Sequence, residues 1–277
     1  MKDIRELFAK IEFLPPSPSL IPKLLPALAD LNSNFDEIVN LIELDPALTA
    51  KLLQICNSAF FGSSNPVEDV RQAVTQTGYQ SISLLAAMIE GSECFQAPEV
   101  PGVSAKSLWK HSVTTAFAAK AVGETMRLEG GLVFTAGLMH DLGKIILARA
   151  YGTEYGLLCL RAAQSTSPVY QAEIAAYGYT HAEVGALLLE KWKLPLPLVS
   201  GVRFHHQPKE ASEAFRKIAG SVCVGNLVAH AQEKPIVLEH PDFQAALALL
   251  HLTPAAVKPW QEELRKSHEL IEAMTRK

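Results

Sequence analysis

Apolar positions recur along this chain with the period of an α-helix almost throughout. In residues 35–42 they fall three and four residues apart, which puts them on one stripe of a helix. We find no Asn-Gly or Asp-Gly hairpin signal between two alternating runs, which an antiparallel sheet would favour. The pattern therefore predicts an all-α fold. The stripe in residues 35–42 consists of Phe35, Ile38, Val39 and Ile42.

Residues typical of helix starts precede several of these stripes. A side-chain oxygen at the cap satisfies free backbone N–H groups of the first turn, and proline fits the first helical position. Between Leu20 and Leu28, by contrast, Pro22 is compatible with a first turn but Pro26 predicts a kink or a break. The candidate starts are Asn34 with Glu37, Asp45 with Pro46, Thr180 with Glu183, and Thr253 with Pro254.

One stretch, residues 92–104, has the composition of a linker, with two prolines, a glycine and no periodic face. We therefore divide the chain into an N-terminal helical subdomain (1–105), a second helical subdomain (106–235) and a C-terminal helical extension (236–277). The apolar residues of segment 46–57 occupy more than one face of a helix, so we expect the first two parts to share a core. The mixed charges of residues 261–277 predict a solvated terminal helix or, as the alternative, a helix that binds a partner.

Composition narrows the class of protein. The 277 residues are 48% hydrophobic and 19% charged, as in an ordinary globular chain. The net charge of −4 argues against a dedicated nucleic-acid binder. The N-terminus is too charged for a secretory signal, and no apolar run approaches the roughly 18 residues of a membrane span. The four cysteines lack metal-type spacing, which indicates reduced thiols. We expect a cytoplasmic protein without a nucleic-acid or membrane partner.

The strongest chemical signal lies in residues 137–144, Gly-Leu-Met-His-Asp-Leu-Gly-Lys. The adjacent His140 and Asp141 could bind one divalent metal through an imidazole nitrogen and a carboxylate oxygen. Lys144 offers a cation suited to a phosphate, and the two glycines would let backbone or substrate approach closely. Upstream, His111 shares a helix face with small residues that would allow close packing against the helix ending at His140. Alternatively, His111 is a core histidine bonded to a backbone carbonyl.

Taken together, His111, His140, Asp141 and Lys144 resemble the HD superfamily of metal-dependent phosphohydrolases. Several further segments, in order along the chain, are similar to the HDOD family, the HD-related output domain of bacterial signalling proteins. The resemblance runs from about residue 14 to about residue 208 and does not include residues beyond about 235. The matching segments are Leu14–Pro16, Asp45–Thr49, Lys51–Leu53, Asn57–Gly62, Val70–Val74 and His181–Leu188.

The resemblance implies front helices packed on an HD-like helical bundle, and a regulatory protein that acts through contacts with other signalling proteins. The HD pattern also needs a late Asp, and Asn226 stands at the matching position; the loss of that carboxylate weakens a metal site. We therefore expect metal binding to be weak or partial and catalysis to be absent.

Three more histidines, His181, His205 and His206, fall near positions where the HD-GYP phosphodiesterase branch carries extra metal ligands, although no Gly-Tyr-Pro triplet follows. The alternative for all three is that they are polar residues of a pocket without a metal, and His181 can also be a first-turn residue after the Thr180 cap. Two functional alternatives stay open. One is a phosphohydrolase or phosphodiesterase that uses iron, manganese or magnesium. The other is an inactive relative that senses a metal, a nucleotide or a cyclic dinucleotide.

Overall fold

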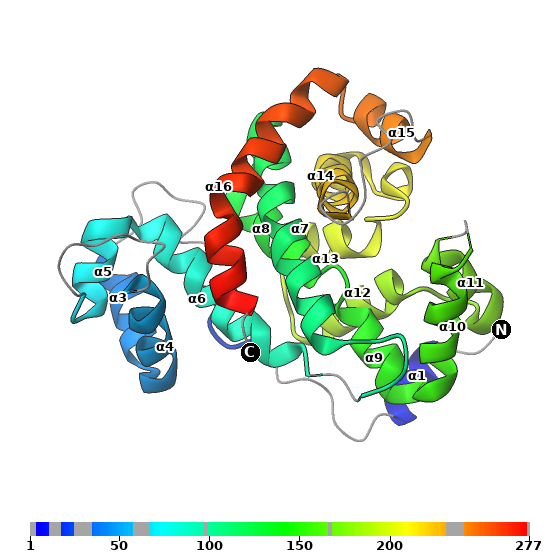
Figure 1. Ribbon diagram of the computed structural model, residues 1–277, viewed down its shortest axis with the longest axis horizontal. Helices are drawn as coiled ribbons and strands as arrows, with labels where there is room; N and C mark the ends of the chain where they lie inside the picture. Colours follow the sequence, from blue (N-terminus) through cyan, green and yellow to red (C-terminus); the bar gives the residue numbers. More distant parts are fainter. Residues whose placement is uncertain are drawn as a thin grey trace.

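Every regular element of the computed structural model is a helix, so the all-α prediction is confirmed for the part of the chain that the structure describes (Figure 1). That part comprises residues 4–10, 18–24, 35–57, 67–96, 99–165, 168–230 and 241–275. The helices are α1 (Ile4–Lys10), α3 (Phe35–Glu43), α4 (Pro46–Cys56), α5 (Val70–Thr77), α6 (Tyr79–Cys94), α7 (Ala105–Thr125), α8 (Gly130–Met139), α9 (Leu142–Tyr151), α10 (Thr153–Ala163), α11 (Val169–Tyr177), α12 (His181–Lys191), α13 (Leu196–Arg203), α14 (Glu213–His230), α15 (Pro241–Leu249) and α16 (Val257–Thr275), with short 3₁₀ turns η1 (Pro208–Glu210) and η2 (Pro254–Ala256).

Two of the predicted helix starts are confirmed, and one is wrong. Asp45 caps α4, where its carboxylate accepts hydrogen bonds from the backbone N–H groups of Ala47 and Leu48 at 2.9 and 3.0 Å. Thr180 and Glu183 form the expected capping box at the start of α12. Thr253 makes no side-chain cap, and the chain enters α16 through a 3₁₀ turn instead. The predictions for Asn34 and Pro26 lie outside the described residues.

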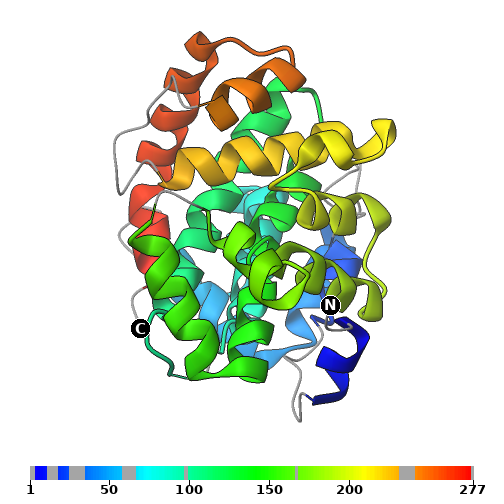
Figure 2. The ribbon, with the colours of Figure 1, turned by 90° about the vertical axis from the view of Figure 1, so that its right-hand side faces the viewer.

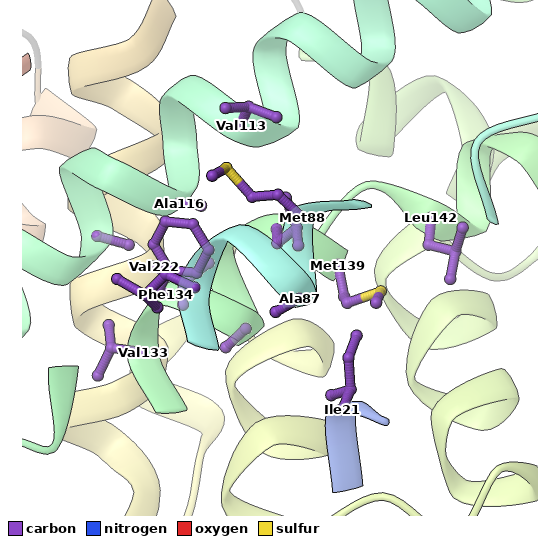
Figure 3. Close-up of a cluster of buried hydrophobic side chains, with 14 of the residues drawn as sticks. Ile21, Ala87, Met88, Val113, Ala116, Val133, Phe134, Met139, Leu142 and Val222 are labelled. Carbon is purple, nitrogen blue, oxygen red and sulfur yellow. The ribbon is translucent and has the colours of Figure 1, made fainter. Parts of the chain in front are cut away.

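Helix α7 is the centre of the molecule. It packs against α8, α14 and α16, and Figure 1 shows these helices around it. Small residues make the close approach possible: a side chain at Gly137 of α8 would meet the backbone of Ala116, and one at Gly225 of α14 would meet the backbone of Ala119. Figure 3 shows part of the apolar core to which these helices contribute, with Phe134 of α8, Ala116 of α7 and Val222 of α14 among the labelled side chains. This packing fixes the positions of the side chains that α7, α8 and α14 carry.

The front helices α3–α6 form a group on one side of the molecule and join the rest through α6 (Figure 1). Helix α6 packs on α8, where Gly91 lies against Leu138. The Glu90 carboxylate of α6 also accepts hydrogen bonds from the backbone N–H groups of Leu20 and Ile21 at 2.8 and 2.9 Å. Buried apolar side chains therefore continue from the front helices into the centre of the molecule.

The last helix differs from its prediction as a solvated terminal helix. One face of α16 is buried against α7 through Trp260, Leu264 and Ile271. The Trp109 indole N–H of α7 donates to the backbone carbonyl of Met274 at 3.0 Å. Charged side chains fill the other face, so the mixed composition had concealed an amphipathic helix.

One apolar stretch reaches the length of a membrane span, contrary to the expectation that none does. Residues Gly130–Tyr151, covering α8 and α9, are by composition long and apolar enough to cross a membrane. However, 89% of the most apolar window is buried inside the protein, where these side chains form the core. The four cysteines, as expected, form no disulfide.

Candidate metal centre

Helices that are far apart in the sequence bring all of the predicted site residues together. His140 and Asp141 form the turn between α8 and α9, and Lys144 follows in the first turn of α9. The remaining positions are His111 on α7, His181 at the start of α12, His205 and His206 after α13, and Asn226 on α14. Figure 2 shows how α14 crosses the molecule between α15 and the helices that carry the other residues. The sequence had suggested these residues as one site through the family resemblance, and the fold places them in one cluster.

The close approach of α9 to α12 depends on Gly143. A side chain there would overlap the backbone carbonyl of His181. The two glycines were expected to let backbone or substrate approach closely, and in both cases it is backbone that does so. The backbone of α7 lies against Gly137, and that of α12 lies against Gly143. The same contact brings the carboxylate of Asp141 to the imidazole of His181.

Asp141 is the common neighbour of the other side chains. Its Oδ2 lies 2.7 Å from the Lys144 Nζ, 3.5 Å from the His140 Nε2 and 3.8 Å from the His111 Nε2. Its Oδ1 lies 3.2 Å from the His181 Nε2. One buried carboxylate thus faces two groups of histidines, and a carboxylate in this position can bridge two cations.

The histidines and Asp141 form two candidate ligand sets. In each set, one ligand atom per residue lies within 4.8 Å of the others. The sets are His111, His140 and Asp141, and His181, His205 and His206.

His140 and His205 are held in the same way, with a nitrogen lone pair directed into the cluster. The Nδ1–H of His140 donates to the Gly137 carbonyl, and that of His205 donates to the Val202 carbonyl, both at 2.7 Å. The Nε2 atoms are therefore unprotonated, and neither has a hydrogen-bond partner among the described residues. Burial lowers the pKa of both rings to about 3. Two buried, neutral imidazoles with unused lone pairs fit a metal ion, which would accept both.

His181 is oriented by a carboxylate that the sequence analysis missed. Glu173 of α11 accepts hydrogen bonds from the His181 Nδ1 at 2.7 Å and from its backbone N–H at 2.8 Å. The other oxygen of Glu173 accepts from the Tyr155 hydroxyl at 2.7 Å. Burial by itself would lower the pKa of His181, but Glu173 and Asp141 together raise it, so this position favours positive charge. A carboxylate behind a histidine commonly orients a metal ligand.

Lys144 and Asp141 form a buried ion pair. Burial disfavours the charged form of each group, but the His140 ring and the Lys144 ammonium hold the pKa of Asp141 well below its usual range. Asp141 in turn raises the pKa of Lys144. Lys144, expected to contact a phosphate, is thus held beside the carboxylate while also lining a cavity.

Asn226 lies where the sequence comparison expected the missing carboxylate, next to His111. The His111 Nε2 donates to the Asn226 Oδ1 at 2.9 Å, so in this arrangement that nitrogen carries a proton and offers no lone pair to a metal ion. Burial, with His230 and His140, holds the pKa of His111 well below its usual value. His230, not predicted, lies one turn after Asn226 on α14, and its ring centroid is 4.3 Å from that of His111. The i, i+4 spacing of Asn226 and His230 is the signal that could have identified it.

Two cavities adjoin the cluster, and His230 lines both. The Lys144 cavity, of about 590 Å³, is lined on its polar side by His111, Asp141, Lys144 and Tyr155. The α15 cavity, of about 410 Å³, lies between the histidines after α13 and helix α15. A ligand could therefore reach the candidate metal ligands from either cavity.

This chain is similar to a known protein family and to several solved structures. Residues 14–208 match the family model of the HDOD domain. An HDOD domain protein of unknown function from Geobacter sulfurreducens superposes with a TM-score of 0.79 at 23% identity, over 98% of this chain and 95% of the other. A protein of Shewanella amazonensis described as a candidate phosphohydrolase superposes with a TM-score of 0.73 at 24% identity, over 97% and 96%. A candidate signal-transduction protein of Marinobacter aquaeolei gives 0.80 at 21% identity, over 98% and 65%. These similarities establish the fold.

A curated relative is longer than this chain. An uncharacterised protein of Treponema pallidum is 28% identical over 222 residues, which cover 79% of this chain and 42% of that protein. The chain thus spans less than half the length of that relative.

Proposed function

Because this chain belongs to the HDOD family, we propose that it is a signalling protein whose histidine–aspartate cluster binds divalent metal ions and, through them, a phosphate ester. One observation carries this proposal. The buried Nε2 lone pairs of His140 and His205 point into a cluster around Asp141, without a hydrogen-bond donor for them among the described residues. Buried polar atoms are normally satisfied, so their convergence supports a cation as the partner. In this proposal the output passes through contacts with other signalling proteins, as the family resemblance implies.

Of the three expected ions, the donor set favours iron most. Most of the candidate ligands are imidazoles, which suit iron, whereas Asp141 supplies the only carboxylate of the two sets. Magnesium prefers an all-oxygen environment and is the weakest of the three expected ions. Because the pKa values of His140 and His205 are about 3, protons do not compete with a metal for these rings at neutral pH.

Each residue has a separate task in this arrangement. His140 and His205 would hold a metal through Nε2 while backbone carbonyls fix their rings. Glu173 orients His181. The Asp141 carboxylate lies 3.5 Å from the His140 Nε2 of the first set and 3.2 Å from the His181 Nε2 of the second. Lys144, on the edge of its cavity, places an ammonium group where the phosphate of a ligand would need a positive charge. Bound metal ions would polarise phosphoryl oxygens and make water a better nucleophile.

Hydrolysis of the phosphate ester is the second candidate function. The shared position of Asp141 between two ligand sets favours it, since paired metals commonly promote displacement at phosphorus. Binding without turnover remains the first candidate because Asn226 replaces a carboxylate and engages the Nε2 of His111. This substitution leaves the first ligand set with one negative charge fewer than the HD pattern provides.

Elemental analysis of the full chain, purified without chelator, tests the proposal. We expect iron or manganese in the wild type, and its loss in Asp141→Ala, which removes a ligand of the first set and the carboxylate that faces His181 of the second set at 3.2 Å. Glu190→Gln, which alters an ion pair with Arg203 at 2.8 Å on the surface, is the control and should retain the metal. A wild type that binds none of the three ions on titration would refute the metal centre.

The same preparations separate the two candidate functions. Turnover of bis(4-nitrophenyl) phosphate with manganese or iron on the order of 1 per second, abolished by Asp141→Ala, would establish hydrolysis. Metal binding without such turnover supports the regulatory function.

A further inference from the structure

The α15 cavity has lining residues that the family match does not cover. The match ends at residue 208, whereas α14 and α15 follow it. From α15 the cavity receives only apolar side chains, and α14 adds two more beside the polar Asn226 and His230. The apolar lining from these two helices consists of Cys223, Leu227, Ala245, Ala246 and Leu249.

An aromatic pair adds to this lining and connects it to the candidate ligands. The Tyr170 and His206 rings, both in the cavity wall, stack with centroids 4.5 Å apart and planes at 19°. His206 in turn places its Nε2 2.9 Å from the Nε2 of His181. Flat rings and small apolar side chains provide a surface for a flat organic group, directly beside the cluster.

The two cavities differ in where their charged residues lie. The Lys144 cavity contains the buried pair Asp141 and Lys144 at the cluster. In the α15 cavity the formally charged residues are Lys209 and Glu210, adjacent in η1 and opposite in sign. The formal charges therefore cancel in both cavities, and the metal ions of the proposed function are what would make the cluster the site for an anionic group. The α15 cavity, which Lys144 does not line, suits a group without charge.

We propose that the α15 cavity binds the flat, uncharged organic group of a phosphate ester whose phosphate lies at the histidine–aspartate cluster, so that α15 selects the ligand. This inference rests on the proposed function. A volume of about 410 Å³ is sufficient for a two-ring aromatic group and lies within the usual range of small-molecule sites. His230, which lines both cavities, lies at the junction between the two parts of the ligand.

Two phosphonates that resist hydrolysis test the proposal. Methylphosphonate and 1-naphthylmethylphosphonate share the anionic group and differ in the ring system. Their binding to the manganese-loaded full chain is measured by isothermal titration calorimetry. We expect the naphthyl compound to bind at least about tenfold more tightly, which corresponds to about 1.4 kcal/mol. The preference arises because the ring system leaves water for the apolar lining.

Substitutions in α15 test whether the preference for the naphthyl compound arises in the α15 cavity. Ala245→Phe places a ring in the cavity from an exposed position and should reduce the preference to about twofold or less, with unchanged affinity for manganese and for methylphosphonate. Leu249→Gln, which adds a polar group without filling the cavity, should reduce it as well. Ala248→Phe is the matched control, because Ala248 is exposed on the same helix but does not line the cavity, and it should bind like the wild type.

The outcomes distinguish this inference from the function on which it rests. Equal affinities of the wild type for the two phosphonates, or a preference that survives both Ala245→Phe and Leu249→Gln, would overturn the assignment of the α15 cavity. If manganese does not bind, the metal centre is refuted. Even in a chain that does not bind manganese, preferential binding of the naphthyl compound that is lost in Ala245→Phe would still support the assignment of the α15 cavity to the ring system.

Discussion

Replacing Glu173 by glutamine separates the charge of this side chain from its hydrogen bonds. In the wild type the Glu173 carboxylate accepts two hydrogen bonds from His181, at 2.7 and 2.8 Å, and one from the Tyr155 hydroxyl at 2.7 Å. A glutamine carbonyl can accept both bonds from His181, while its amide donates to the Tyr155 oxygen. The variant therefore keeps the geometry and loses the negative charge behind the imidazole.

Because Glu173→Gln keeps the geometry and removes only the charge, we expect a small effect on stability and a larger effect on metal affinity. Three hydrogen bonds to a charged acceptor become neutral and weaker, but the cost of burying a charge also disappears, so we expect a loss of about 1 kcal/mol in the free energy of unfolding. That corresponds to a fall of about 2–4 °C in the melting temperature of the metal-free protein. Loss of a carboxylate behind a metal-binding histidine typically lowers metal affinity about 10- to 100-fold.

The assay is titration of the metal-free variant with manganese, followed by calorimetry or by competition with a chelator, beside thermal unfolding. Glu190→Gln removes the same charge from α12, the helix that begins at His181, but its carboxylate pairs with Arg203 on the surface. It should bind manganese as the wild type does. The reasoning is refuted if Glu173→Gln binds manganese with wild-type affinity, or if Glu190→Gln lowers the affinity equally.

Three further predictions concern the metal ligands and the packing. Asn226→Asp restores a carboxylate beside His111 and should strengthen manganese binding about tenfold; unchanged affinity in a folded variant would mean that this helix is wrongly aligned with the HD pattern. Gly143→Ala forces α9 away from α12 and should lower the unfolding free energy by about 1–3 kcal/mol in chemical denaturation, whereas Gly130→Ala, which meets only flexible side chains, should cost less. A fragment of residues 1–100 should not melt cooperatively, because α6 would lose the apolar surface of α8; a cooperative transition of that fragment would show that the front helices do not need the shared core.

The tertiary contacts of the site were not apparent in its local sequence. Glu173 lies in a helix eight residues before His181, and no spacing rule connects the two across the intervening turn. His230 is similarly isolated until α14 and α7 are packed together. The terminal helix shows the opposite case: its buried stripe was present in the sequence, but the numerous charges of its other face hid it.

The sequence by itself determined the helical class, the caps at Asp45 and Thr180, and which imidazoles and carboxylates were candidates for metal binding. These properties depend on periodicity and on the chemistry of single residues, which are local. Only the tertiary structure decided that Asp141 faces two sets of histidines, that Glu173 orients His181, and that α15 closes a cavity beside them. The physical reason is that these relations depend on how closely α9, α12 and α14 approach one another. That distance is set by packing between helices far apart in the chain.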